Sequence, residues 1–164
     1  MPSAKQQVVS LIHTYQAAVY QAVALLNAKS EQEKGFQMQQ ERPGVWAGYL
    51  DELKQVHYSF HGAGCLLTTP AFTVDFDYAQ EGGCTGIDPW FLFYFLQSNP
   101  AIQANYSLLT SSEQVAQILQ ELVQEGLLTR YLYSEDDRRY YLMADIQNPD
   151  LPTVTLYMPD EDVS

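Results

Sequence analysis

The hydrophobic pattern of this chain changes its period once, and that change limits the folds it can adopt. Across residues 4–29 apolar side chains recur every three or four positions, as on one face of an α-helix. From residue 55 the spacing becomes two, because Val56, Tyr58 and Phe60 alternate with polar residues, and the alternation returns at 72–78. The first pattern predicts a long amphipathic helix, and the second predicts strands with one buried face.

Turn and capping signals divide the rest of the chain. Residues 30–44 are polar and glutamine-rich, and they are predicted to form a loop. Asp88 followed by Pro89 predicts the start of a short, deeply buried helix. Thr110 with Glu113 has the spacing of a capping box and predicts the start of another helix. The predicted elements are helices 4–29, 88–98 and 111–125 and hairpins 55–79 and 127–143.

These elements predict an α+β fold, with a central antiparallel sheet built from the two hairpins and about three helices packed on one face. Residues 1–145 are expected to form a single domain, and residues 146–164 an acidic, proline-containing extension. The glycines of His61-Gly62-Ala63-Gly64 predict a bulge in the first strand. A phosphate-binding loop is disfavoured because no helix follows them.

The charge balance favours some partners over others. Eight basic and twenty acidic residues give a formal net charge of -12. Such a field repels phosphate backbones, so we do not expect nucleic acid as a ligand, and it steers association with a basic protein. Acidity also serves solubility alone. The longest apolar run, 89–96, is too short to cross a bilayer and no secretory signal is visible, so we expect a cytoplasmic protein with reduced Cys65 and Cys84.

Polar residues of the 55–79 hairpin form the strongest candidate for chemistry. His57 and His61 share one face of their strand, as do Asp75 and Asp77 on the next. Two imidazoles with carboxylates suit zinc, iron or manganese, or general acid–base catalysis. A solvated sheet face has the same alternation, and we favour this simpler reading. No cofactor or metal is therefore expected.

The sequence offers two further candidate sites, one for nucleophilic catalysis and one for DNA binding. Cys65 after the glycines could act as a nucleophile beside His61, although reduced cysteine is more often a buried core residue. The segment 111–143 has the helix-plus-hairpin order of a winged-helix module. Its arginines are offset by neighbouring acids, so DNA binding is not expected.

Three segments carry a family resemblance: FHGAGC at 60–65, VDFDY at 74–78 and GIDPW at 86–90. They resemble the FHGxGC, VDFDF and GxDxW-like segments of a bacterial domain family of unknown function. The resemblance implies no established activity. Such small acidic domains often occur beside bacterial polymorphic toxins, including those of contact-dependent growth inhibition, where immunity proteins neutralise a cognate toxin domain.

Together these features predict a binding protein rather than an enzyme. The first hypothesis is an immunity protein that binds a basic toxin domain, expected to be a nuclease. The alternatives are a metal-dependent or cysteine enzyme centred on His61, Cys65, Asp75 and Asp77, and a housekeeping interaction domain. Aromatic anchors among acids are typical of tight interfaces. The predicted partner-binding residues are Tyr131, Tyr133, Glu135, Asp136, Asp137, Tyr140 and Tyr141.

Overall fold

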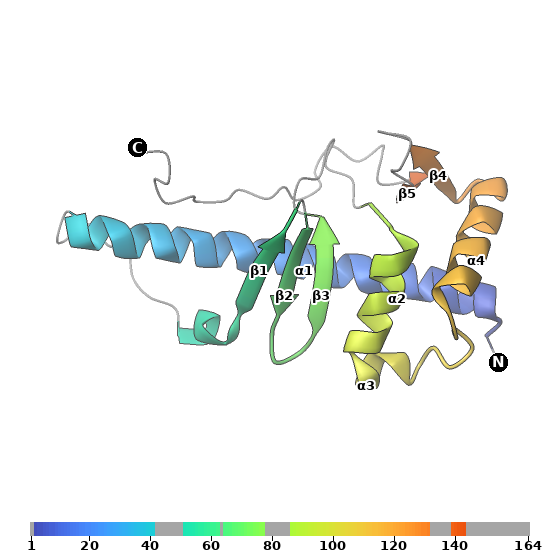
Figure 1. The fold of residues 1–164 in the computed structure, drawn as a ribbon, viewed down its shortest axis with the longest axis horizontal. Helices are drawn as coiled ribbons and strands as arrows, with labels where there is room; N and C mark the ends of the chain where they lie inside the picture. Colours follow the sequence, from blue (N-terminus) through green and yellow to red (C-terminus); the bar gives the residue numbers. More distant parts are fainter. Residues whose placement is uncertain (1, 42–50, 63, 78–85, 132–138, 144–164) are drawn as a thin grey trace.

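The structure is a computed structural model that describes residues 2–41, 51–62, 64–77, 86–131 and 139–143 (Figure 1). Side chains are described for all of these except Gln39, Asp77, Tyr131, Arg139 and Tyr141. The helices are α1 (Ala4–Glu41), the 3-10 helix η1 (Asp51–Gln55), α2 (Pro89–Ser98), α3 (Pro100–Gln103) and α4 (Ser112–Gln124). The strands are β1 (His57–His61), β2 (Gly64–Thr68), β3 (Thr73–Asp77), β4 (Leu128–Tyr131) and β5 (Arg139–Leu142).

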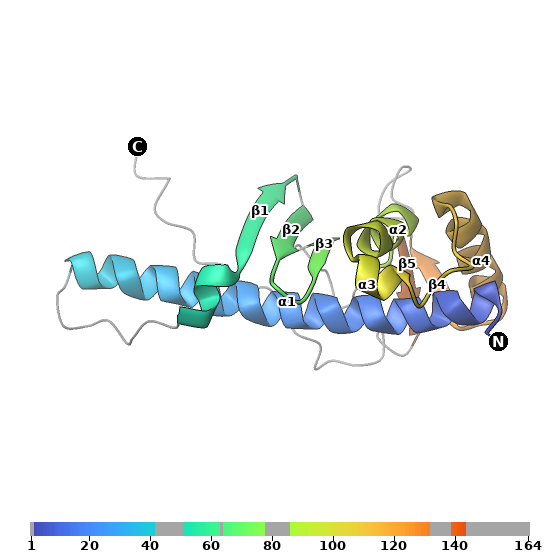
Figure 2. The ribbon, with the colours of Figure 1, turned by 90° about the horizontal axis from the view of Figure 1, so that it is seen from below.

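The helix α1 has 38 residues, and the other elements lie along one side of it (Figures 1 and 2). After α1 the chain returns along the helix, so that η1 and β1 lie near its C-terminal half and α4 near its N-terminus. The predicted apolar stripe is confirmed as the centre of the core. Its fully buried positions are Val8, Leu11, Ile12, Tyr15, Val19, Ala22, Val23 and Leu26.

The predicted loop at 30–44 is wrong over residues 30–41, which continue α1. This part of the helix contacts the strand that follows it in sequence. The Tyr58 hydroxyl donates to both carboxylate oxygens of Glu33, at 3.1 and 3.0 Å, and the Lys29 ammonium lies 6.0 Å from the Tyr58 ring centroid. Burial, with the Glu33 charge, raises the pKa of Tyr58 to about 12. Long-range contacts therefore support a helix that local composition did not predict.

The strands β1, β2 and β3 form an antiparallel sheet in sequence order. His61 pairs with Gly64 on β2, and Gly64 pairs in turn with Asp77 on β3. The predicted bulge is therefore wrong, because β1 ends at His61 and a separate antiparallel strand, β2, begins at Gly64. Gly62 has a φ of 58°, a left-handed conformation that glycine adopts without strain.

The second hairpin, β4 and β5, forms its own two-stranded sheet. An isolated bridge joins it to the segment before α2: Ile87 N–H donates to the Tyr140 carbonyl at 2.8 Å, and Tyr140 N–H donates back at 3.0 Å. The α+β class is confirmed. Among the described residues, the two hairpins occupy separate sheets instead of sharing one.

Capping side chains position the starts of α2 and α4. Asp88 caps α2 as predicted, accepting a hydrogen bond from the Trp90 N–H at 2.7 Å. The cap of α4 lies one residue beyond the predicted Thr110, at Ser111, whose hydroxyl accepts from Gln114 N–H at 3.1 Å. The Gln114 side chain in return accepts from Thr110 N–H at 2.7 Å. The Ser111 half of a capping box is present, shifted by one residue, whereas the Gln114 side chain bonds the N–H of the residue before the cap.

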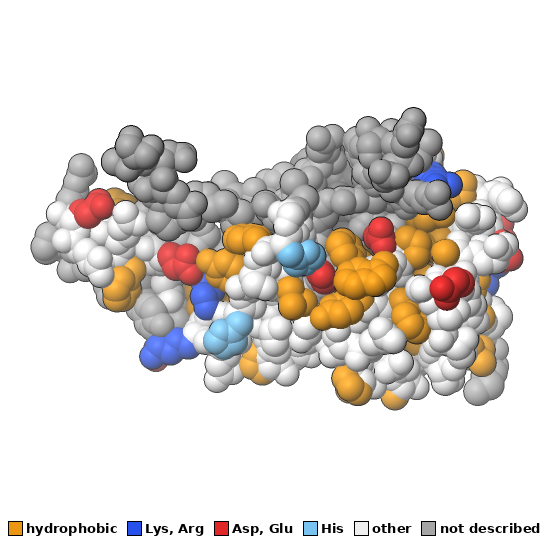
Figure 3. Space-filling view, viewed as in Figure 1, with side chains coloured by type: hydrophobic (Ala, Val, Ile, Leu, Met, Phe, Trp, Pro, Cys, Tyr) orange, Lys and Arg blue, Asp and Glu red, His pale blue; other side chains and the backbone are white. Residues whose placement is uncertain are grey.

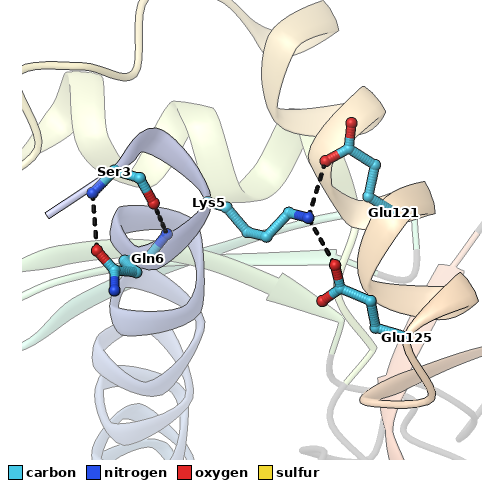
Figure 4. A network of polar contacts seen from close by, with 5 residues as sticks. All are labelled: Ser3, Lys5, Gln6, Glu121 and Glu125. Atoms are coloured by element: carbon cyan, nitrogen blue, oxygen red, sulfur yellow. Dashed lines mark hydrogen bonds and ion pairs between the residues drawn. The ribbon is translucent and has the colours of Figure 1, made fainter.

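Polar contacts fix the N-terminus of α1 against α4 (Figure 4). The Lys5 ammonium lies 3.3 Å from a Glu121 carboxylate oxygen and 2.6 Å from one of Glu125. The hydrogen bond to Glu125 is the main cause that raises the pKa of Lys5. Ser3 and Gln6 bond each other's backbone N–H groups in the first turn. These contacts set the position of α4 relative to the helix on which the core is built.

A window of α1 is long and apolar enough to cross a membrane, judged by length and composition alone. Half of that window is buried inside the protein. The core helix of a soluble protein meets the same criterion, so the finding is weak evidence for a membrane span.

Asn99 joins the end of α2 to the start of β3. Its amide nitrogen donates to the carbonyls of Thr73 and Phe95, both at 2.7 Å, and its amide oxygen accepts from Thr73 N–H at 2.8 Å. The side chain is buried, so these bonds replace contacts with water. Asn99 thus satisfies backbone groups at the edge of the sheet and fixes α2 beside it.

We expect Asn99→Ala to destabilise the protein by about 2–3 kcal/mol, because buried backbone groups of Thr73 lose their partner. Urea unfolding followed by circular dichroism measures the change. Asn105→Ala, at an exposed position, is the control and should change the free energy of unfolding by less than about 0.5 kcal/mol. Equal effects of the two substitutions would contradict this role for Asn99.

Candidate functional site

The three-stranded sheet has one face packed against α1, and none of the helices in the described ranges lies over its other face. Cys65, Val74 and Phe76 point into the core, and the Tyr15 hydroxyl of α1 donates to the Asp75 backbone carbonyl at 3.0 Å. The opposite side, here called the open face, consists of His57, Ser59, His61, Leu66, Thr68, Thr73 and Asp75. Figure 3 views the molecule from this side and shows two histidines, one near the middle of the view and one lower and to the left.

A hydrogen bond across the sheet joins two of the predicted site residues. His61 Nε2 on β1 lies 2.8 Å from Asp75 Oδ1 on β3, although β2 runs between these strands. The bond is possible because Gly64 on β2 lies beneath the imidazole. A Cβ atom at Gly64 would lie 2.5 Å from His61 Cε1, which is too close for any real contact. The glycine is required so that the histidine can cross the middle strand.

The pair combines an accessible imidazole with an inaccessible carboxylate. The His61 side chain is 50% exposed, whereas that of Asp75 is 5% exposed. Burial raises the pKa of Asp75, and the hydrogen bond from His61 and a backbone hydrogen bond from Phe76 oppose this rise. A buried acid that orients an exposed imidazole is an arrangement found in general bases and in positioned hydrogen-bonding sites.

The remaining proposed metal ligands do not join this pair. His57 pairs with Thr68 at the far end of β1, and the side chain of Asp77 lies outside the described residues. In the part of the chain that the structure describes, no group of three or more His, Cys, Asp or Glu side chains is placed to hold a metal ion. The described geometry therefore gives the metal hypothesis no support.

Cys65 lies on the other side of the sheet from His61. It pairs with Phe60 on the face packed against α1, and it is fully buried. Burial raises the pKa of its thiol to about 12. Because the thiolate is the reactive form, a nucleophilic role beside His61 has no structural basis.

The N-terminal part of α2 presents aromatic side chains beside the open face. Trp90 is 55% exposed and stacks on Tyr94, with ring centroids 5.1 Å apart and planes 13° apart. The prediction that this helix is deeply buried is therefore only partly right, because Leu92 and Phe95 are buried and Trp90 is not. Figure 3 shows hydrophobic side chains over α2 next to a histidine of the sheet. The sequence signal was the spacing of four between Trp90 and Tyr94, which places them together on one side of a helix.

A cleft of about 560 Å³ adjoins Trp90, between the starts of α2 and α4 and the strand β4. Its wall includes Glu113, Arg130 and the ring of Tyr140, and the Arg130 guanidinium lies 5.8 Å from the centroid of that ring. Asp88 also lines the cleft, but its carboxylate already caps α2. Two carboxylates and one guanidinium line the cleft, and Asp88 is already engaged at the start of α2, so the cleft by itself gives no clear charge preference.

The predicted partner-binding residues fall mostly outside the described part. Tyr133, Glu135, Asp136 and Asp137 lie there entirely, and Tyr131 and Tyr141 have only their backbones described, in β4 and β5. Tyr140 is 3% exposed and packs in the core. Its ring reaches the cleft wall but offers little surface to a partner. The predicted set did not include the exposed Trp90 of α2 or Tyr94, on which it stacks.

Fold and site together define a small α+β protein in which a His–Asp pair and an aromatic helix surface share one side. The chain belongs to the family described as Domain of unknown function (DUF6896), whose sequence profile matches residues 8–142. The match runs from the first turns of α1 to the end of β5. No curated protein and no solved structure gives a significant match.

We expect Gly64→Ala to destabilise the protein by about 1–3 kcal/mol, because the added methyl group forces the imidazole away from Asp75. Chemical unfolding measures the loss. The matched control is the same change in a His61→Ala background, where nothing obstructs the methyl group. In that background Gly64→Ala should be neutral or slightly stabilising, since alanine loses less conformational entropy than glycine when it folds into a strand. A similar loss in both backgrounds would show that the clash is not the cause.

We expect His61→Ala to lower the free energy of unfolding by about 1–3 kcal/mol at neutral pH, because the substitution leaves the buried Asp75 carboxylate without its side-chain partner. Removing that partner raises the pKa of Asp75 further. The penalty appears as pH rises from the folded-state pKa of Asp75 in wild type, itself raised, toward the still higher pKa in the variant, and it shrinks below that range, where the carboxyl is neutral in both proteins. Unfolding at several pH values measures it. In an Asp75→Asn background, His61→Ala should lower the free energy of unfolding by a smaller amount, and this amount should not depend on pH in this range.

Proposed function

We propose that this protein binds a basic partner protein through the open face and the adjoining aromatic surface of α2. As its biological role we propose that of an immunity protein, which neutralises a cognate bacterial toxin domain, expected to be a nuclease. The observation that carries the proposal is the exposed Trp90, stacked on Tyr94, on the surface of a protein with a net charge of -12.

The Trp90–Tyr94 pair supports binding because its rings are large and already held in one arrangement. Tryptophan and tyrosine are enriched among the residues that dominate the energy of protein interfaces. Stacking against Tyr94 limits the rotamers of Trp90 before any partner arrives, so little side-chain entropy is lost on binding. The surface is therefore prepared for contact with an apolar part of a partner.

The charge supports the choice of a basic partner. An excess of acidic residues accelerates encounter with a positively charged protein and disfavours other acidic proteins. The open face itself contains no lysine or arginine, and its buried carboxylate, Asp75, adds negative potential. A nuclease domain is a fitting target, because surfaces that bind nucleic acid are basic.

A general-base enzyme is the second candidate, favoured by the contact between exposed His61 and buried Asp75. Such an enzyme should turn over a substrate in the absence of a protein partner and lose that turnover in His61→Ala. A binding protein should instead act stoichiometrically, so that protection is complete at one molecule per toxin.

The test is coexpression with the product of the neighbouring upstream gene, measured by copurification and by survival of the cells. We expect wild type to bind and protect, and Trp90→Ala to bind at least about tenfold more weakly because an interface anchor is lost. Leu108→Ala is the control, since it removes another exposed apolar side chain away from α2. Neither binding nor protection by wild type would reject the proposed role. Equal weakening by both variants would reject the proposed surface.

A further inference from the structure

The direction of the His61–Asp75 hydrogen bond follows from the charge of the carboxylate. Asp75 accepts a hydrogen bond from the backbone of Phe76 as well as its contact with His61. An ionised carboxylate is an acceptor only. At a pH above the raised pKa of Asp75, His61 Nε2 must carry a hydrogen and donate a hydrogen bond to Asp75 Oδ1, which fixes the tautomer of the neutral ring.

This tautomer leaves His61 Nδ1 with a free lone pair. Among the described residues Nδ1 makes no hydrogen bond, and the side chain is half exposed. Gly64 beneath the ring and Asp75 beyond it hold the imidazole flat across β2. The sheet therefore presents an oriented hydrogen-bond acceptor at a fixed point of its surface.

The surroundings of His61 suit a long side chain with a charged end. A shallow hollow of about 190 Å³ lies along the same face, lined by His57, Ser59 and Leu66 among others. On the other side, α2, which carries the stacked rings, packs against β3, and Figure 3 shows hydrophobic side chains beside a histidine there. A lysine or arginine can lay its aliphatic stem on such surfaces while its end group donates hydrogen bonds.

We infer that His61 Nδ1 is the point at which the open face recognises a lysine or arginine of the partner, accepting a hydrogen bond from the cationic group. The inference rests on the proposed binding function and adds the chemistry of the contact. Asp75 supplies the negative charge, and the imidazole carries its effect to the surface. A hydroxyl donor would satisfy Nδ1 equally well but would gain nothing from the buried charge or from the net charge of -12.

Nitrogen-15 NMR of the histidine side chains in the whole chain tests the first step. At a pH where the ring is neutral, His61 should show a protonated Nε2 and an unprotonated Nδ1, with His13 and His57 as internal references. Asp75→Asn should relax this preference. A His61 ring with its proton on Nδ1, or with the mixed tautomers of an exposed histidine, would overturn the inference.

Titration with argininamide tests the second step, and citrullinamide, which has a similar shape without the charge, is the matched control. Argininamide should shift the Nδ1 resonance of His61 and the indole N–H of Trp90 at millimolar concentrations. Citrullinamide should produce less than about one third of that shift at equal concentration. Equal shifts with both, or no shift of Nδ1 with either, would overturn the inference.

His61→Gln separates recognition from structural support. Glutamine can still donate to Asp75 through its amide, but it places no acceptor where Nδ1 lies. We expect it to keep most of the stability that His61→Ala loses, yet to weaken toxin binding at least fivefold. Full neutralisation of the toxin by a stable His61→Gln protein would contradict the inference and leave the proposed function intact. Failure of wild type to bind any toxin would instead reject the proposed function.

Discussion

The buried stripe of α1 is the interaction on which the rest of the structure depends. Tyr15 lies in the middle of this stripe, where its hydroxyl bonds the Asp75 carbonyl and its ring meets Phe95 edge to face at 5.6 Å between centroids. One residue of α1 thus contacts both β3 and α2. Because the sheet and α2 share this support, the His–Asp pair and the aromatic surface keep a fixed relation to each other.

The sequence predicted those features that depend on neighbouring residues. Alternation identified the segments that form β1 and β3 but not β2, the strand between them, and Asp88 followed by Pro89 identified the start of α2. The end of α1 could not be predicted in the same way, because the contact between Glu33 and Tyr58 forms only after the chain has folded back. The register of the strands has the same limitation. The alternating sequence placed His61 and Asp75 on one polar face of the sheet, but it did not show how their strands pair. The strand that separates them, and the glycine that allows their contact, required the structure.

The FHGAGC segment therefore serves both the fold and the site. Phe60 and Cys65 pair across the hairpin, with Cys65 fully buried, whereas His61 and Gly64 pair on the open face. Burying a carboxylate is unfavourable unless hydrogen bonds compensate, and a core built only for stability has little use for one. The Asp75 side chain is nevertheless almost inaccessible, and its partner is half exposed. Among the described side chains, His61 is the one that bonds the Asp75 carboxylate and also reaches the surface.

Net charge and local contacts make different contributions to the proposed binding. A charge of -12 acts over about a Debye length, roughly 8 Å at physiological salt, and attracts any basic protein. It cannot distinguish one basic surface from another. Discrimination requires groups with fixed positions, and the described surface offers two of different chemistry: the stacked rings of Trp90 and Tyr94, and the oriented nitrogen of His61. A partner that satisfies both must place an apolar patch and a cationic side chain at a set separation, which is a condition that general basicity does not meet.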